Sequence, residues 1–223
     1  MDDQEHTGVE ASLAALFDAE RESRRLHDVL AARGRGGKLD ELLAAVGEMV
    51  TACAELEAGE ATLRLVCIAR LLGEFDGPAT ADGLIDVLNT THGEARHEAG
   101  EQLQGMACDR FGDVSKAVTR ALKRLPPGSP ALAELPYVLV EIPERRVVAI
   151  LGEFLAHEDA DAVAAAIEAL AEVGDGSTVE LLRRLEGDKR VSSVGEEDEP
   201  GGDVTIGELA SEAIELLRQA DEE

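Results

Sequence analysis

Apolar positions recur at helical spacing in residues 162–185, "AVAAAIEALAEVGDGSTVELLRRL". In the first half an apolar residue returns at every third or fourth position, which makes one face of an α-helix. These residues are Val163, Ala166, Ile167, Leu170 and Val173. Gly174 follows directly, and glycine adopts the left-handed backbone conformation that ends many helices. The pattern therefore predicts a helix that stops at Gly174.

A second helix is predicted just after this stop. Ser177 and Glu180 have the spacing of a capping box, in which each side chain accepts a hydrogen bond from the other residue's backbone N–H. Val179, Leu182 and Leu185 then share one face. Both helices are too short to be stable alone, so each must bury its apolar face against a neighbour.

The same two-helix pattern recurs upstream without a gap. Thirty-one residues earlier, the aligned apolar residues are Leu132, Leu139, Ile142, Val148, Leu151 and Phe154. Ninety-eight residues earlier, they are Leu65, Ile68, Ala69, Leu72, Phe75, Leu84 and Val87. Two ungapped matches that include both helices and the break indicate a structural repeat.

Looser copies complete the series. One has first-helix residues Ala99, Leu103 and Met106, second-helix residues Val118, Ala121, Leu122 and Leu125, and a longer loop, "ACDRFGD", at 107–113. A last helix carries Ile214 and Leu217 after a second capping box at Thr205 and Glu208. We therefore expect about four helix pairs and a terminal helix over residues 61–220, with spacings of 31 to 36 residues before the last step.

Repeats of this period are typical of solenoids, in which stacked units share one core. The chain lacks the Trp of tetratricopeptide repeats and the "TPLH" of ankyrin repeats. Residues 162–185 and "CIARLLGEFDGPATADGLIDVL" instead resemble the short bacterial HEAT repeats, also called PBS-lyase-like HEAT repeats. The resemblance implies an all-α, right-handed α-α superhelix whose second helices line a concave surface. Bilin lyases and DNA glycosylases occur among proteins with similar repeats, but neither activity carries over to this chain.

The third repeat departs from the family pattern at one proline and has a second proline where a helix can begin. Pro136 stands where Ile167 stands in the next repeat, so its first helix is predicted to start late or to kink. Pro143 is expected to be the first residue of the second helix.

Residues 1–60 do not fit the repeat and are predicted to form an N-terminal helical hairpin that caps the exposed end of the core. One helix carries Val9, Leu13, Leu16 and Phe17, and the other carries Leu39, Leu42, Leu43, Val46, Met49, Val50, Cys53 and Leu56. A separate interaction hairpin is the alternative. "ARGRGGK" at 32–38 lacks the spacing of a phosphate-binding loop and is interpreted as a basic turn between the two helices.

Residues 188–203, "DKRVSSVGEEDEPGGD", form an acidic insert before the last helix. Its Gly and Pro content predicts a solvated loop, and its flanks "VSSV" and "VTI" are candidates for a short β-hairpin. The loop is either a partner contact or a linker without a role, and both alternatives stay open.

Composition narrows the classes of function. Aromatic residues make up 2% of the 223 residues, which favours helices built on Ala and Leu. A formal net charge of −26 opposes binding to nucleic acid or anionic lipid; it either favours a basic partner or is a solvated acidic surface without a specific role. Of the three cysteines, Cys53 and Cys67 are expected to be buried reduced thiols. With no signal peptide and no membrane-spanning run, a cytoplasmic location is expected.

We predict no catalytic, cofactor-binding or metal site. His92 and His97 are five residues apart, which does not place two ligands on one helix face, and "HEAGE" lacks the second His of HExxH. One pattern stands out: basic residues gather on or just before the predicted second helices. They form a candidate basic strip for a partner, or else they make ion pairs with abundant carboxylates. They are Lys116, Arg120, Lys123, Arg124, Arg145, Arg146, Arg183 and Arg184.

The expected function is a non-enzymatic scaffold or adaptor that binds a protein through its concave face. The alternatives are an acidic inhibitor or immunity-type protein that binds a basic partner, and an accessory or regulatory subunit of an enzyme that acts through residues 188–203. No nucleic-acid or membrane partner is expected.

Overall fold

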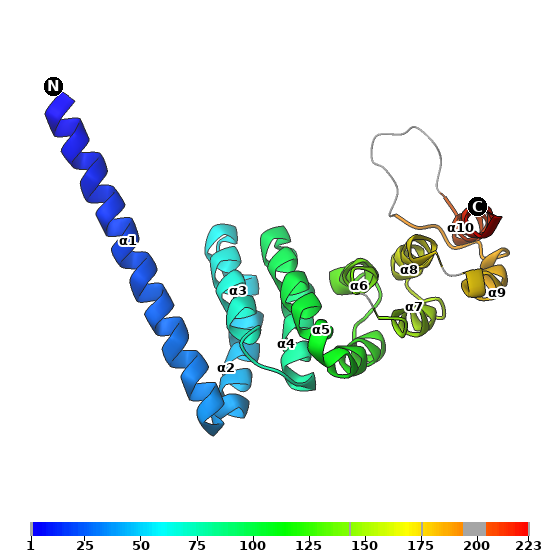
Figure 1. Ribbon diagram of the computed structural model, residues 1–223, viewed down its shortest axis with the longest axis horizontal. Coiled ribbons are helices and arrows are strands. Elements are labelled where there is room, and N and C mark those ends of the chain that lie inside the picture. Colours follow the sequence, from blue (N-terminus) through cyan, green and yellow to red (C-terminus); the bar gives the residue numbers. More distant parts are fainter. Residues whose placement is uncertain (1, 143, 175, 194–203, 223) are drawn as a thin grey trace.

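The computed structural model describes residues 2–142, 144–174, 176–193 and 204–222, with side chains from residue 8 to residue 219 within these ranges. Almost all of this part of the chain is helical (Figure 1). The α-helices are α1 Asp2–Arg33, α2 Leu39–Ala52, α3 Ala58–Leu72, α4 Pro78–Leu88, α5 Gly93–Arg124, α6 Pro130–Val140, α7 Val147–Phe154, α8 Ala160–Val173, α9 Val179–Leu182 and α10 Ile206–Glu222. Within these ranges, β-pairing is limited to one antiparallel bridge between Val191 and Thr205. The all-α prediction is confirmed.

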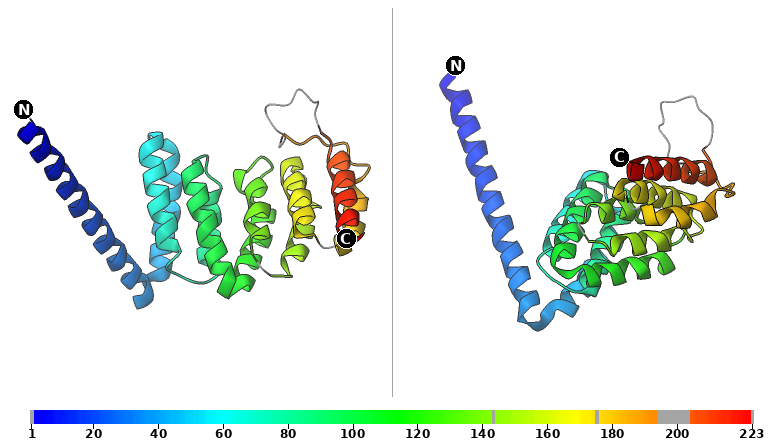
Figure 2. Two further views of the ribbon diagram at one scale, coloured as in Figure 1. Left: turned by 45° about the horizontal axis from the view of Figure 1, so that its top comes forward. Right: turned by 45° about the vertical axis from the view of Figure 1, so that its right-hand side comes forward.

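From α3 onward the helices lie side by side in chain order. We call α3, the first half of α5, α6, α8 and α10 the first layer, because each packs on the next. The second layer consists of α4, the second half of α5, α7 and α9. Figures 1 and 2 show the row, and Figure 1 shows α3 from the side but α8 and α10 nearly end-on. The helix axes therefore turn progressively along the row.

One apolar core runs through both layers from Val46 in α2 to Leu217 in α10. The aligned repeat positions supply its largest fully buried side chains, including Leu65, Leu84, Leu139 and Phe154. Val173 is an exception: it is 38% exposed, because it lies on the last turn of α8 beyond the next helix's cover. The predicted alternation of core and surface is otherwise observed across the aligned helices.

The sequence predicted a loop at 107–113, and this prediction is wrong. Helical hydrogen bonding continues through it, and α5 is one bent helix with a single non-helical residue, Arg110, at φ −132° and ψ 40°. Ala107, Phe111 and Val114 are buried around the bend, which explains why the segment stays packed. Likewise α6 begins at Pro130 and continues through Pro136, so the predicted late start does not occur. Pro143 lies outside the described residues, and α7 begins at Val147.

Helix ends follow the predicted chemistry in part. Gly174 has φ 70° and ends α8 in the left-handed conformation, as predicted. The box at Thr205 is confirmed: the Glu208 N–H donates to Thr205 Oγ1 (3.2 Å) and the Thr205 N–H donates to Glu208 Oε2 (2.9 Å). The segment after Ser177 differs, because α9 begins only at Val179 and has 3₁₀ turns, Gly176–Thr178 and Arg183–Leu185, on both sides.

The N-terminal hairpin does not close. Helix α2 packs on α4, but α1 projects away from the body in Figure 1 and contacts it mainly through its last turns. Ala31 is buried against Leu71 and Phe75. The predicted apolar face lies open: the exposed fractions are 59% for Val9, 45% for Leu13, 60% for Leu16 and 54% for Phe17. The far half of α1 therefore adds nothing to the core among the described residues.

The turn between α1 and α2 is where the sequence placed it, at Gly34–Lys38. A Cβ on Gly34 would lie 2.5 Å from the Phe75 ring, so only glycine fits there.

Cys53 is buried as predicted, and burial raises the pKa of its thiol. The prediction for Cys67 is wrong: it is exposed, because it lies on the face of α3 that looks away from the core.

Candidate protein-binding groove

The candidate basic strip lies along the second layer, and its residues are exposed. Two of them reach back to α4: the Arg120 guanidinium lies 2.8 Å from Asp82, and that of Arg124 lies 2.6 Å from Asp86. Arg120 also donates to the Pro78 carbonyl (3.0 Å). Burial raises the pKa of the Asp86 carboxyl, while the bond to Arg124 opposes that rise. These two arginines therefore tie neighbouring helices together.

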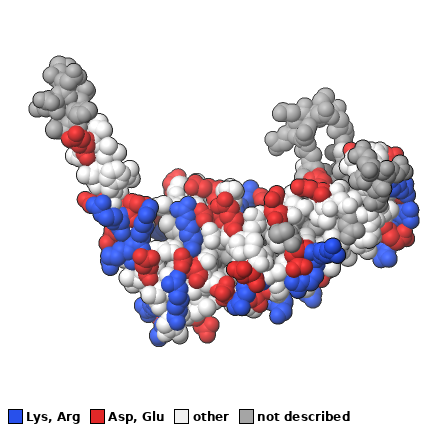
Figure 3. Space-filling model, viewed as in Figure 1, with Lys and Arg blue, Asp and Glu red and all other residues white. Residues whose placement is uncertain are grey.

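The other six basic residues of the strip divide into two groups. Arg146 bonds Glu144 (3.0 Å) and covers the Phe111 ring at 4.8 Å, and Arg183 bonds Glu180 (2.6 Å). For the rest of the strip, no salt-bridge partner is found among the described residues; these are Lys116, Lys123, Arg145 and Arg184. Figure 3 shows basic and acidic side chains intermingled over the face that it presents. The ion-pair alternative thus accounts for half of the predicted strip.

The histidines singled out by the sequence lie in separate surroundings. His92 Nδ1 is 3.1 Å from Thr62 Oγ1, and His97 lies 3.7 Å from Glu101 on the same helix. The described part of the chain holds no group of three or more His, Cys, Asp or Glu side chains placed to bind a metal ion. None of its helices is both long enough and apolar enough to cross a membrane.

Two hollows mark the surface. A polar one of about 260 Å³ lies at the bend of α5, between Cys108 and Arg146. A larger one of about 600 Å³ is a groove between α8 and α10. We call this the α8–α10 groove; its lining residues are Ile167, Glu168, Ala171, Glu172, Leu209, Glu212, Ala213, Leu216 and Leu217. Its apolar floor and carboxylate rim are features of a peptide-binding surface.

Polar bridges close each earlier junction of the first layer. Arg70 of α3 bonds Glu98 of α5 (2.8 Å). Arg96 of α5 bonds Glu134 of α6 (3.1 Å). The Tyr137 hydroxyl of α6 donates to Glu168 of α8 (2.5 Å). Burial, followed by that bond to a carboxylate, raises the pKa of Tyr137, so the phenol keeps its proton at neutral pH.

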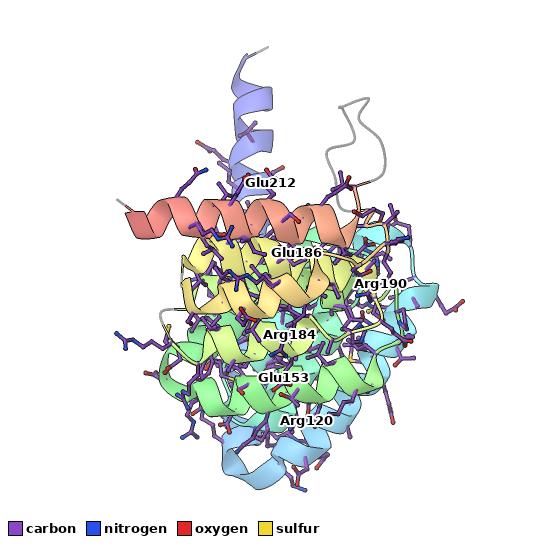
Figure 4. All side chains as sticks on the ribbon, turned by 90° about the vertical axis from the view of Figure 1, so that its right-hand side faces the viewer. Arg120, Glu153, Arg184, Glu186, Arg190 and Glu212 are labelled. Atoms are coloured by element: carbon purple, nitrogen blue, oxygen red, sulfur yellow. The ribbon has the colours of Figure 1, made fainter. Side chains whose placement is uncertain are left out.

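The junction between α8 and α10 is different. No side-chain hydrogen bond or ion pair joins these two helices among the described residues. Leu216 is 53% exposed beside the groove, and Glu172 and Glu212 are exposed on its two sides. Figure 4 shows Glu212 on α10, with Arg184 and Arg120 on elements below it. The groove and the basic strip thus lie on different layers.

The sequence reasoning missed this groove. A signal was present, because Leu209, Ala213 and Leu216 follow one another at i, i+4 and i+7 on α10. They form a second apolar line beside Ile214 and Leu217, the pair that identified the helix. One helix with two apolar lines has more apolar surface than a single neighbour can cover.

The described flanks of the acidic insert are held against α8. Arg190 bonds Asp188 (2.6 Å) and donates to the His157 carbonyl (2.7 Å). The Ser193 N–H donates to Asp161 Oδ1 (2.7 Å). The predicted hairpin is reduced to the bridge between Val191 and Thr205. Residues 194–203, which carry the acidic run, lie outside the described residues, so the two alternatives for the loop stay open.

Comparison with known proteins identifies no family for the chain. No family model matches it, and no curated protein matches it. It is similar to a crystal structure described as an engineered protein of the Northeast Structural Genomics Consortium, at 18% identity and a TM-score of 0.34, over 89% of each chain. A TM-score of that size supports no conclusion about fold or function.

Proposed function

We propose that this chain is a HEAT-like α-solenoid that acts as a non-enzymatic scaffold for a protein partner. Helices stacked in chain order, one shared core and progressively turning axes support the solenoid assignment. The resemblance of residues 162–185 to short bacterial HEAT repeats supports the same assignment and a right-handed superhelix.

The α8–α10 groove is the observation that carries the binding role. Binding sites are typically mostly apolar hollows of about 300–1,000 Å³, and this groove of about 600 Å³ with its apolar floor falls in that class. The groove takes precedence over the basic strip, since half of the strip is already paired within the chain. We therefore propose a partner surface on the first layer, in place of the concave face that the sequence analysis expected on the second helices.

A second candidate is an acidic inhibitor that occupies a basic site on its partner. Its support is the net charge of −26 together with the carboxylates Glu168, Glu172 and Glu212 around the groove. Both candidates bind a protein. They differ in the consequence, because an inhibitor abolishes an activity of its partner whereas a scaffold leaves that activity intact.

Affinity capture with a matched surface variant tests the proposal. The tagged chain and its Leu216→Glu variant are used as bait in an extract of cells that contain the chain naturally, and bound proteins are compared by quantitative mass spectrometry. We expect at least one protein to bind the unchanged chain and to be depleted about tenfold with the variant. Recovery of no specific protein by the unchanged chain would contradict the scaffold proposal. Assaying the partner's own activity with and without the chain separates scaffold from inhibitor.

A further inference from the structure

We propose that the α8–α10 groove binds an amphipathic, basic α-helix of a partner protein. This inference rests on the proposed function and specifies the chemical class of the partner segment. It starts from the break in the bridging pattern: three junctions of the first layer are closed by Arg70–Glu98, Arg96–Glu134 and Tyr137–Glu168, and the fourth is open.

The shape of the groove favours a helix as its occupant. Two helices lying side by side form a furrow that accepts the side-chain ridge of a third helix. The floor residues of α10 extend from Leu209 to Leu217, about two helical turns or roughly 12 Å. An occupant with apolar residues at i, i+3 or i+4, and i+7 matches that length. A β-strand would need an unpaired strand edge, and the described chain has only the single bridge at Val191.

The charges on the groove select a basic helix. Glu168 and Glu172 are one turn apart on α8, and Glu212 lies across the groove on α10. Neither Glu172 nor Glu212 has a Lys or Arg partner among the described residues. Lysines or arginines flanking the apolar line of the occupant would therefore meet carboxylates that no internal ion pair neutralises.

A second copy of this chain does not fit these charges. Its exposed apolar helix, α1, carries Glu10 beside Val9, Leu13, Leu16 and Phe17, and the sequence has no Lys or Arg before Arg21. That apolar stretch would therefore bring no basic residue to the carboxylates of the rim. The occupant is thus assigned to a different protein.

Fluorescence anisotropy with a synthetic probe tests the assignment. The probe is a labelled peptide of about 18 residues with Leu at i, i+3, i+4 and i+7 and Lys elsewhere, titrated at about 150 mM salt. We expect a Kd of about 1–100 µM. Leu216→Ala should weaken binding about fivefold, because the probe then loses apolar contact with a half-exposed leucine. The double variant Glu172→Lys/Glu212→Lys should weaken it at least about tenfold.

A matched control separates groove binding from general attraction to an acidic protein. Glu10→Lys/Glu48→Lys makes the same change in net charge at exposed positions of α1 and α2, at the other end of the row. We expect less than about a twofold effect from it, and at least about tenfold weaker binding by a peptide of the same composition in scrambled order. Circular dichroism confirms that each variant keeps the fold.

Two results would overturn the assignment. One is an equal loss of peptide binding in both double variants, because the peptide would then respond only to the net charge of the protein. The other is a concentration-dependent dimer of the unchanged chain that is lost in the Leu216→Ala variant. The occupant of the groove would then be a second copy of this chain. Either result leaves the scaffold proposal standing if affinity capture still recovers a partner. The two proposals can therefore fail separately.

Discussion

At the scale of single residues, Asp159 and Gly174 determine where α8 begins and ends. Asp159 caps the N-terminus: its Oδ1 accepts from the N–H groups of Asp161 (2.9 Å) and Ala162 (3.2 Å). Its Oδ2 accepts from the Gly128 N–H (2.6 Å), which fixes the turn before α6 against the start of α8. Gly174 ends the helix. A 14-residue helix is thus fixed at both ends, and one cap also links the start of α8 to the turn before α6.

Gly174→Ala should destabilise the protein by about 1 kcal/mol, because alanine resists φ 70°. Gly105→Ala is the matched control, since Gly105 lies inside α5 with nothing near its missing Cβ. It should stabilise the protein by about 0.5–1 kcal/mol through reduced chain entropy. Urea unfolding followed by circular dichroism measures both, and the same sign for the two substitutions would contradict the assigned backbone conformation.

Asp159→Ala should lower the free energy of unfolding by about 2 kcal/mol, because it removes the cap and leaves the Gly128 N–H without its acceptor. Asp159→Asn should cost about half as much. Its amide oxygen keeps the cap, but its NH₂ group cannot accept from Gly128. Denaturant titration of the three proteins checks this order. A loss for the asparagine variant as large as for alanine would mean that the link to Gly128, rather than the cap, accounts for the effect.

At the scale of elements, the helices divide into those inside the row and α1, which leaves it. Helix α8 has neighbours on several sides and is buried around most of its circumference from Ala162 to Ile167. Helix α1 is buried at Ala31 alone among its described residues. Three internal ion pairs, Arg21–Asp18, Arg24–Glu20 and Arg25–Glu22, lie along its middle and support a helix that has few tertiary contacts.

Deleting residues 1–20 should change the melting temperature by less than about 2 °C, because Leu13, Leu16 and Phe17 make no contribution to the core. Phe75→Ala is the contrasting change: it removes the ring that anchors Ala31 and Gly34 and should cost about 3 kcal/mol. Differential scanning calorimetry compares the two. A large loss on deletion would show that the projecting half of α1 is packed in solution.

The base of the insert gives a pH-dependent contribution. The bond to Arg190 lowers the pKa of Asp188, so this pair stabilises the fold above the ordinary carboxyl pKa and is lost as the pH falls through the lowered value. Asp188→Asn should reduce the melting temperature by about 1–3 °C at pH 7. The difference from the unchanged chain should shrink as the pH falls through the lowered pKa of Asp188. A difference that is constant with pH would assign the effect to packing.

At the scale of the whole molecule, the dominant property is the excess of acidic over basic residues. The chain carries 47 acidic and 21 basic residues, and each earlier junction of the first layer places a carboxylate against an arginine or a tyrosine. The surplus carboxylates repel one another over the surface. Stability should therefore depend on ionic strength.

Raising NaCl from about 50 mM to about 500 mM at pH 7 should raise the melting temperature by about 3 °C or more, since screening weakens this repulsion. The same change near pH 5 should have a smaller effect, because the net charge is lower closer to the isoelectric point of 4.4. Scanning fluorimetry over a grid of salt and pH measures this. A fall in melting temperature with salt at pH 7 would show that the internal ion pairs outweigh the repulsion.

The sequence predicted the helices and much of the core because short amphipathic helices bury one face. The spacing of Leu65, Leu139 and Ile167 was enough to place them inside. It failed where tertiary contacts decide between equal local patterns. Residues 107–113 looked like a loop, yet Phe111 packs into the core and keeps α5 continuous. Cys67 was expected to be buried, but it lies between the buried residues Val66 and Ile68 on the outer face of α3 and is exposed.

At the candidate site, the difference between what the sequence predicts and what the tertiary structure decides is larger. The sequence alone determined the recurring apolar pattern, the acidic charge and the positions of the basic residues. Only the tertiary structure decided that Arg120 and Arg124 are paired with α4, and that the junction between α8 and α10 has no bridge. The reason is physical: helical periodicity is a local property of the chain, whereas an ion pair or an uncovered groove depends on residues tens of positions apart.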